Sequence, residues 1–477
     1  MDRHSFTDLD DASMTGDMED LPALTCPSCG ADLVEDELFL AHRVCTHCGR
    51  HFSLPARARI DALVDAGSFR PITAQPAALV EMDNDQLSVA DRIAERRERS
   101  VLDEAIVTGT ATIGGKRVVI VALDDHLVGA QVGALGAEKI IIGLEHALAQ
   151  RIPVVAICAG GAARTHSGPL ALVQGSRLAA TASQLQVAGV PMIAILTHPT
   201  SAGVFGSFAS QGDLIFAEPG THLGVALVAG PSLETAEQAV GEQELLEHGW
   251  IDGIVPRPLL RHHLDVLLDL LGRRGRGALW REAPDVPATG TAGRDGAPPA
   301  QHPDRPTAAF YLERLLSPFI EIRGDRVAAD DRQVICGIGR LDQATVAIVA
   351  QDRQATPGRH DATAALRKVT RLARLAGRFE LPLLLLVDAP GVEAPAVIAP
   401  DEALAIAKLN SMLAMLPVPV VSVAVGRVRG LLGMTLMTGD RRLMQEHATW
   451  QLPGSAITRA GRVPVPPAGS EVFQERS

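Results

Sequence analysis

The sequence predicts an α/β protein made of two tandem copies of one strand–loop–helix unit, preceded by a four-cysteine zinc ribbon. Two observations predict this fold class. Apolar runs of strand length alternate with helix-length segments in two separate series, and four cysteines near the N-terminus stand in two close pairs. A length of 477 residues allows several domains, and a composition of 47% hydrophobic and 21% charged residues is that of a globular chain.

The chain begins with an acidic segment. Residues 1–21 hold seven carboxylates and one basic side chain, Arg3, so we expect a solvated, disordered tail. The rest of the chain has no basic stripe, which argues against nucleic acid as a partner. No signal-peptide pattern and no apolar run of the roughly 20 residues needed to span a bilayer is present, so we expect a cytoplasmic protein with no membrane partner.

The first ordered region is predicted to be a zinc ribbon over residues 22–54. Cys26 and Cys29 form one C-x2-C pair, Cys45 and Cys48 form another, and fifteen residues separate the pairs. Four thiolates in a tetrahedral arrangement bind structural Zn²⁺ and leave no open position for catalysis. We therefore predict one structural zinc ion per chain.

An internal repeat fills most of the remaining sequence. The apolar runs of the first series are 118–123, 153–158 and 191–197, and those of the second are 346–350, 382–387 and 419–425. Pro191 is followed 22 residues later by Asp213, and Pro419 is followed 21 residues later by Asp440. We therefore predict two related domains, at 55–272 and 302–477, joined by a flexible linker rich in Pro, Gly and Ala at 273–301.

Glycine-rich loops follow the predicted strands. Gly160 and Gly161 lie between a strand and a helix-length segment, and Ala202 and Gly203 lie in the loop after the next strand. Main-chain N–H groups in such loops are fixed before negative charge develops, which suits an oxyanion hole. The repeat makes Gly391 and Gly430 the corresponding donors in the second copy. No triad or pair of carboxylates accompanies these loops, so the sequence favours catalysis by main-chain amides.

From Cys26 to about Leu271 the chain resembles the β subunit of the bacterial acetyl-CoA carboxylase carboxyltransferase. The residues that carry this resemblance are the four cysteines, the Gly160-Gly161-Ala162 loop and the run His198–Pro219. From His302 onward the chain resembles the α subunit of the same enzyme. That resemblance is carried by His302-Pro303, Arg305-Pro306, Gly324-Asp325-Arg326, Ala329-Asp330-Asp331, Asp388, Pro390-Gly391 and Gly439-Asp440.

The resemblance implies a crotonase-like (ClpP/crotonase) β-β-α spiral in each copy. It also implies transfer of a carboxyl group from carboxybiotin to acetyl-CoA, giving malonyl-CoA for fatty acid biosynthesis, with paired oxyanion holes. Biotin would arrive on a separate biotin carboxyl carrier protein, loaded by a separate ATP-dependent biotin carboxylase. Gly430 and Gly433 would contact the biotin, and a homo-oligomer is expected.

The second copy departs from the family pattern at Arg427, Arg429, Leu431 and Leu432, which stand where the family has small residues. Two alternatives therefore stay open. One is a biotin-independent decarboxylase of malonyl-type thioesters, carried on CoA or on an acyl carrier protein. The other is a non-catalytic subunit with the crotonase fold.

Overall fold

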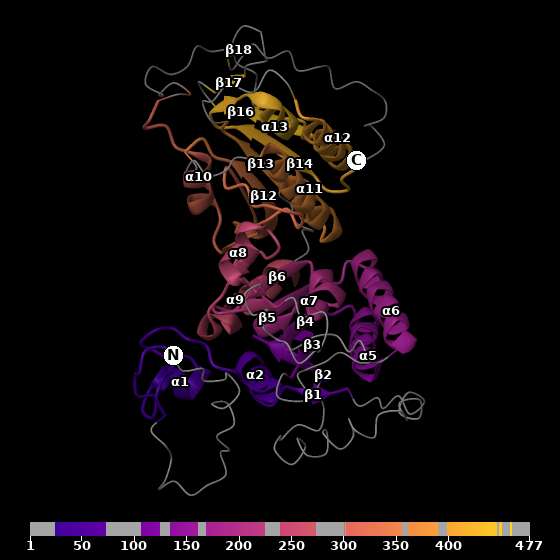
Figure 1. Cartoon of the computed structure of the whole chain (residues 1–477). Helices are drawn as coiled ribbons and strands as arrows, with labels where there is room; N and C mark the ends of the chain where they lie inside the picture. Colours follow the sequence, from indigo (N-terminus) through magenta and orange to yellow (C-terminus); the bar gives the residue numbers. More distant parts are fainter. Residues whose placement is uncertain are drawn as a thin grey trace, which may run out of the picture. The chain divides into compact units, whose positions relative to one another are not determined.

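The computed structural model describes residues 24–72, 106–124, 134–160, 168–224, 239–272, 300, 302–354, 361–389, 398–445, 448–450 and 458–459. The chain divides into two compact units, Met1–Gly272 and Arg273–Ser477, whose helices and strands are labelled in Figure 1. The predicted tail 1–21 and all of the predicted linker except Ala300 lie outside the described residues, as do Gly161 and Gly391.

A nine-stranded sheet organises the first unit, with its main path in the order β1-β2-β3-β4-β5-β6-β9. The first three strands are antiparallel neighbours, and β3 to β6 and β9 are parallel. The short strands β7 and β8 attach beside β5. The strands are β1 (Arg70–Pro71), β2 (Ile106–Ile113), β3 (Lys116–Leu123), β4 (Val154–Gly160), β5 (Met192–Ser201), β6 (Leu214–Ala217), β7 (His222–Gly224), β8 (Val240–Gly241) and β9 (Gly253–Ile254).

The second unit repeats this plan in a six-stranded sheet of order β10-β11-β12-β13-β14-β16. Its first three strands are again antiparallel and the rest parallel. The strands are β10 (Phe319–Glu321), β11 (Val334–Leu341), β12 (Ala344–Gln351), β13 (Leu383–Val387), β14 (Val420–Ala424) and β16 (Arg441–Met444), with a separate small sheet of β15 (Arg427–Val428), β17 (Thr449–Trp450) and β18 (Thr458–Arg459). The six strands expected from the apolar runs are confirmed as β3, β4, β5, β12, β13 and β14.

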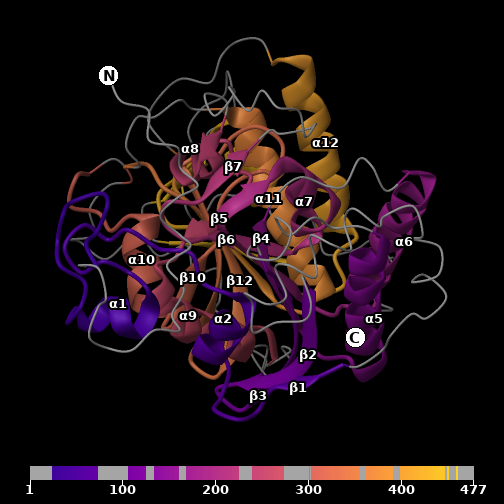
Figure 2. The same cartoon turned by 60° about the horizontal axis from the view of Figure 1, so that its bottom comes forward.

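Helices cover both sheets in corresponding positions. In the first unit they are α1 (Glu37–His42), α2 (Ala56–Leu63), α5 (Ala134–Gln150), α6 (Gly168–Val187), α7 (Ala202–Ser207), α8 (Glu242–Glu247) and α9 (Arg257–Gly272). In the second they are α10 (Ala308–Leu315), α11 (Ala362–Arg378), α12 (Pro400–Ala414) and α13 (Gly430–Leu436). α5 packs on β2 and β3 with α6 beside it, and α11 packs on β11 and β12 with α12 beside it (Figures 1 and 2).

Side-chain caps explain where several helices begin. Asp36, Thr307 and Asp361 each accept a hydrogen bond from the main-chain N–H three residues later, at the start of α1, α10 and α11. Such a cap satisfies one of the N–H groups that have no acceptor within the helix. Within the described residues, no helix is both long and apolar enough to cross a bilayer.

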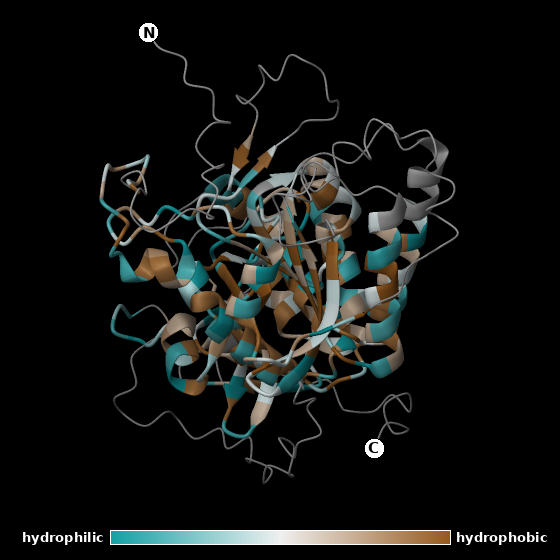
Figure 3. Ribbon diagram, turned by 90° about the horizontal axis from the view of Figure 1, so that it is seen from below, coloured by the Kyte–Doolittle hydropathy of each residue, from teal (hydrophilic) through white to brown (hydrophobic). Residues whose placement is uncertain are grey.

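The central strands are covered on both faces, which is why they appear in the sequence as unbroken apolar runs. Val119 and Val121 of β3 belong to the core that includes Ile140 of α5. The alternate residues Val118 and Ile120 point to the opposite face and are equally inaccessible to solvent. Figure 3 shows this hydrophobic character along the strands.

The two aspartates that marked the repeat make the same contact. Asp213 Oδ2 accepts the main-chain N–H of Met192 at 2.8 Å, and Asp440 Oδ2 accepts that of Val420 at 2.8 Å. Each aspartate therefore holds the start of the strand that follows Pro191 or Pro419. A second pair recurs at the ends of β3 and β12, where Asp124 accepts the N–H of Ala56, the first residue of α2, and Asp352 accepts the N–H of Ala309, the second residue of α10.

Candidate functional site

In the first unit, the loops that hold the predicted donors meet at the carboxyl ends of β4 and β5. Gly160 is the last residue of β4 and pairs with Thr200 of β5. Its φ of 100° is a conformation that only glycine adopts readily. Ala202 and Gly203 follow directly as the first residues of α7. The structure thus brings Gly160 close to Ala202 and Gly203, although their role as oxyanion donors stays a prediction.

Hydroxyl groups fix the main chain of these loops. Thr200 Oγ1 donates to the carbonyl of Thr197 at 2.6 Å, and Ser201 Oγ accepts the N–H of Val204 at 3.1 Å. Ser201 is thereby the N-cap of α7. The first-turn N–H groups of a helix have no acceptor within that helix, so this arrangement presents polar hydrogens at the edge of the sheet.

Next to β6 lies a buried cluster of charges that the sequence analysis did not anticipate. Glu218 follows β6, is 2% exposed, and is held by two arginines. Arg59 Nη1 lies 3.1 Å from both of its carboxylate oxygens, while Arg257 contacts them at 2.9 and 2.7 Å. Burial alone would raise the pKa of Glu218, but the two guanidinium groups lower it to about 2.

The four cysteine sulfurs of the ribbon lie within 4.8 Å of one another. Two of the separations, Cys26 to Cys48 and Cys29 to Cys45, are 3.6 and 3.8 Å. A tetrahedral zinc ion with sulfur ligands at about 2.3 Å has sulfur–sulfur separations of about 3.8 Å. The cluster therefore has the dimensions and the chemistry of a metal site, as the cysteine spacing predicted.

Arg257 links this ribbon to the sheet of the first unit. Its Nη1 donates to the ribbon carbonyls of His42 at 2.9 Å and Phe52 at 3.1 Å, and its Nε and Nη2 bind Glu218. Its main-chain N–H also donates to His51 Nε2 at 3.2 Å. His51 is thus used in packing, and burial lowers its pKa.

In the second unit, Asp388 joins the loops after β13 and β14. Its carboxylate is fully buried, accepts a hydrogen bond from Arg353 Nη1, and accepts the main-chain N–H of Arg427 at 3.3 Å. The N–H of Ala389 donates to the carbonyl of Arg427 at 2.7 Å. Burial raises the pKa of Asp388 in spite of the neighbouring Arg353.

The predicted biotin contacts lie beside these loops. Gly430 is the first residue of α13 and has a φ of 70°, a left-handed conformation that favours glycine. Gly433 lies one turn later, and Leu432 is 9% exposed. Leu432 is therefore largely packed into the second unit. The role of Gly430 and Gly433 as biotin contacts stays a prediction.

Arg59, Arg257 and Arg353 are residues that the sequence analysis missed. Arg59 and Arg257 stand at helical spacing from the buried apolar residues of α2 and α9, which was the available signal, whereas Arg353 lies in a turn after β12 and has no such pattern. Their partners are far away in the sequence, so no local spacing could identify the pairs.

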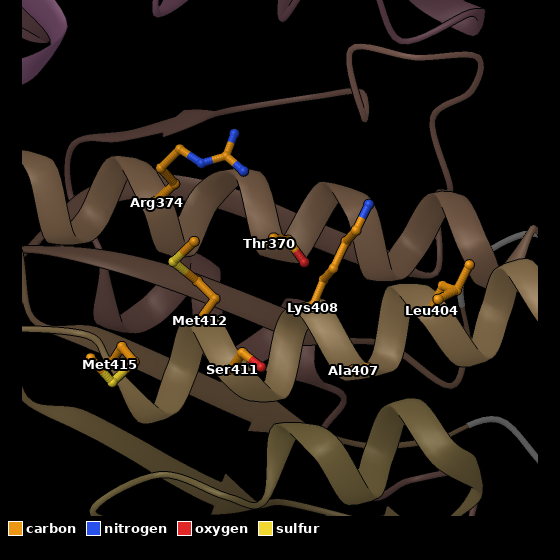
Figure 4. A pocket seen from close by; sticks show the side chains of 8 residues that line it. All are labelled: Thr370, Arg374, Leu404, Ala407, Lys408, Ser411, Met412 and Met415. Carbon is orange, nitrogen blue, oxygen red and sulfur yellow. The ribbon is translucent and has the colours of Figure 1, made fainter.

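α11 and α12 border a surface hollow of about 470 Å³ (Figure 4). Its charged lining residues are Arg374 and Lys408, and the exposed Leu404 and Met415 add apolar surface. None of the predicted donors lines it, so we do not assign the reaction to this hollow.

Family models match both halves of the chain. Residues 50–248 match the carboxyl transferase domain, and residues 297–454 match the acetyl co-enzyme A carboxylase carboxyltransferase-like family. The beta/alpha carboxyl transferase subunits of acetyl-coenzyme A carboxylase from Salinispora tropica are 37% identical over 458 residues, covering 90% of this chain and 80% of that protein. The corresponding protein of Saccharopolyspora erythraea is 33% identical, with coverage of 90% and 78%.

Solved structures show a similar fold. Transcarboxylase 12S superposes with a TM-score of 0.62 at 18% identity, covering 83% of this chain and 76% of that one. A single-chain, multi-domain long-chain acyl-CoA carboxylase gives 0.63 at 20% identity, covering 87% and 42%. These likenesses confirm the predicted crotonase-like α/β fold.

Proposed function

Because the chain belongs to the family of acetyl-CoA carboxylase carboxyl transferases, we propose that it transfers a carboxyl group to acetyl-CoA and forms malonyl-CoA. When bound, biotin on a separate carrier protein supplies the activated carboxyl group, and a separate biotin carboxylase loads it. We also propose that the protein works as a homo-oligomer. The observation that supports this function is the gathering of candidate donor loops at the carboxyl ends of the central strands in both units.

On the acyl side, the proposed donors are the main-chain N–H groups of Gly160, Gly161, Ala202 and Gly203. The thioester oxygen becomes negatively charged when the neighbouring carbon loses a proton, and N–H groups directed at that oxygen stabilise the enolate. One such donor typically contributes about 3–4 kcal/mol to the transition state. The bonds made by Thr200 and Ser201 would keep these donors in place before the substrate binds.

On the biotin side, the proposed donors are the N–H groups of Gly391 and Gly430, with Gly433 close to the ring. These N–H groups would bind the urea oxygen of biotin and orient the biotin ring. Asp388 supports this site indirectly, because it bonds the main chain of Arg427 next to Gly430. Gly430 has no described atom within 4 Å of the position of a Cβ, which supports approach of a ligand there.

For the ribbon, we propose that the metal is Zn²⁺ and that its role is structural. Four cysteine ligands leave the ion no open coordination position. Cys26, Cys29, Cys45 and Cys48 would hold together the two segments whose carbonyls bind Arg257.

The function is tested by incubating the purified protein with malonyl-CoA, with and without biocytin, and measuring acetyl-CoA. Biocytin-dependent turnover is expected for a carboxyltransferase. Turnover that does not require biocytin would instead indicate the decarboxylase, and no turnover in either assay would indicate the non-catalytic subunit.

A proline substitution tests the acyl-side donors. Ala202→Pro removes one N–H at the first position of α7, where proline is tolerated, and Ser201 already has the extended conformation that precedes proline. We expect kcat to fall by about 10²- to 10³-fold. Ala202→Gly keeps the N–H and should retain most of the activity, so equal loss in both variants would contradict the assignment.

A further inference from the structure

Gln351, the last residue of β12, has a side-chain acceptor that none of the described residues uses. The residue is 5% exposed. Among the residues that the structure describes, its Oε1 is buried and has no hydrogen-bond partner. A buried polar atom without a partner costs free energy, so such an atom calls for a functional or solvent explanation.

The unpaired oxygen lies at the edge of the sheet where the biotin-side loops begin. Gln351 pairs with Val387, the last residue of β13. A Cβ placed on Gly433 would lie 3.4 Å from Gln351 Oε1 and 3.9 Å from the Cβ of Ala389. Ligands of open α/β sheets bind at the carboxyl ends of the parallel strands, and Gln351 stands at that end.

The first unit shows what the fold needs at this position. Leu123 ends β3 just as Gln351 ends β12, and an aspartate that caps a helix follows each of them. Leu123 is fully buried in the same apolar cluster as Val204 of α7. An apolar side chain is therefore sufficient for packing, and the glutamine of the second unit has no structural requirement in the shared fold.

We propose that Gln351 Oε1 is a side-chain contact for a cyclic urea, accepting a hydrogen bond from a ring N–H. The transferred carboxyl group occupies one ring nitrogen, so the other N–H remains available to Gln351. This inference rests on the proposed function and names the chemical group that the second unit recognises.

Gln351→Leu tests the proposal, because it restores the side chain found in the first unit. Removal of a buried unpaired oxygen should raise the Tm by about 2–4 °C. At the same time we expect the KM for biocytin to rise at least about tenfold, with the KM for malonyl-CoA unchanged. Gln351→Met, which is unbranched and close in shape, should behave in the same way if the leucine variant folds poorly.

Binding measured without turnover gives an independent readout. Calorimetric titration should show that the wild-type protein binds biocytin more tightly than biocytin methylated on both ring nitrogens, and that Gln351→Leu loses this preference. The exposed Gln354, exchanged for leucine, is the matched control and should leave binding unchanged.

The outcomes separate this inference from the proposed function. A Gln351→Leu variant with raised Tm and an unchanged KM for biocytin would overturn the role of Gln351 while leaving carboxyl transfer in place. A wild-type protein that neither binds biocytin nor turns over in its presence would overturn the proposed function together with this inference.

Discussion

Each unit holds a buried carboxylate just beyond the end of a central strand, but the two are bound differently. Glu218 of the first unit contacts two arginines, and one of these also binds the carbonyls of the metal ribbon. Asp388 of the second unit contacts one arginine and one main-chain N–H of the neighbouring loop. Glu218 therefore connects the four-cysteine ribbon to the sheet of the first unit through Arg257. Asp388 instead connects two loops of the candidate site.

This difference is set against a common framework. The strand order, the helix placement and the aspartate contacts at Asp213 and Asp440 are the same in both units. The comparison indicates that the fold common to both units depends on the shared apolar strands and aspartates. The contacts between arginines and buried carboxylates differ from one unit to the other.

Metal removal should give the largest difference between the units. Structural zinc contributes about 10–16 kcal/mol to the folding of isolated zinc-finger peptides. Arg257 contacts both the ribbon and Glu218, so loss of the ribbon structure should also disturb Glu218. After chelation we expect hydrogen exchange to accelerate in the ribbon and around Glu218, but not in β13 of the second unit. Equal acceleration in both units would contradict the proposed coupling through Arg257.

Loss of one charge should be the next largest effect. Glu218→Gln leaves two buried arginines without a carboxylate, and breaking a buried ion pair costs about 3–5 kcal/mol. Asp388→Asn should cost less, since only Arg353 loses its partner. Denaturant unfolding measures both. The control is Glu138→Gln, whose partner Arg177 is partly exposed and which should cost less than about 1 kcal/mol. A reversed order of the two buried variants would contradict the comparison.

Matched glycines should behave alike in the two units. A Cβ on Gly109 would lie 2.5 Å from the Phe69 ring, and one on Gly337 would lie 2.3 Å from the Phe319 ring. Gly109→Ala and Gly337→Ala should therefore each cost about 1–3 kcal/mol through overpacking, as measured by denaturant unfolding. A cost confined to one unit would show that the β-hairpins are not equivalent.

An effect of opposite sign in the two units is expected with pH. The pKa of Glu218 is lowered from 4.5 to about 2, so its contribution is complete above pH 4.5 and is lost as the pH falls toward 2. The pKa of Asp388 is raised above 3.8, so the folded form binds the proton more tightly and stability falls as the pH rises past 3.8. The free energy of unfolding should be measured from pH 2 to 8. Glu218→Gln should remove the loss of stability between pH 4.5 and 2, and Asp388→Asn should remove the fall in stability above pH 3.8.

The sequence was sufficient to predict the parts of the fold that have a local pattern. The parallel strands were recognisable because both of their faces are buried, as at Val118 and Val119, and the four-cysteine cluster because its cysteines have a characteristic spacing. The antiparallel strands β2 and β11 were missed, since their glycines and threonines interrupt the apolar run.

The charged contacts of the site could not be predicted in this way. Arg59 and Glu218 are 159 residues apart, and Arg353 and Asp388 are 35 apart. Only the folded sheet brings them together, so the sequence could not show which carboxylate each arginine binds. The sequence predicted donor loops at Gly160 and Ala202, and their role stays a prediction; their pairing through Thr200 depends on the register of β4 and β5.

The aspartate contacts at Met192 and Val420 have a consequence for the history of the chain. Both partners of each contact belong to the same half, so a gene divided within 273–299 would leave every one of these bonds within a single product. Division of the polypeptide at that point would therefore leave the starts of β5 and β14 held as they are in the single chain.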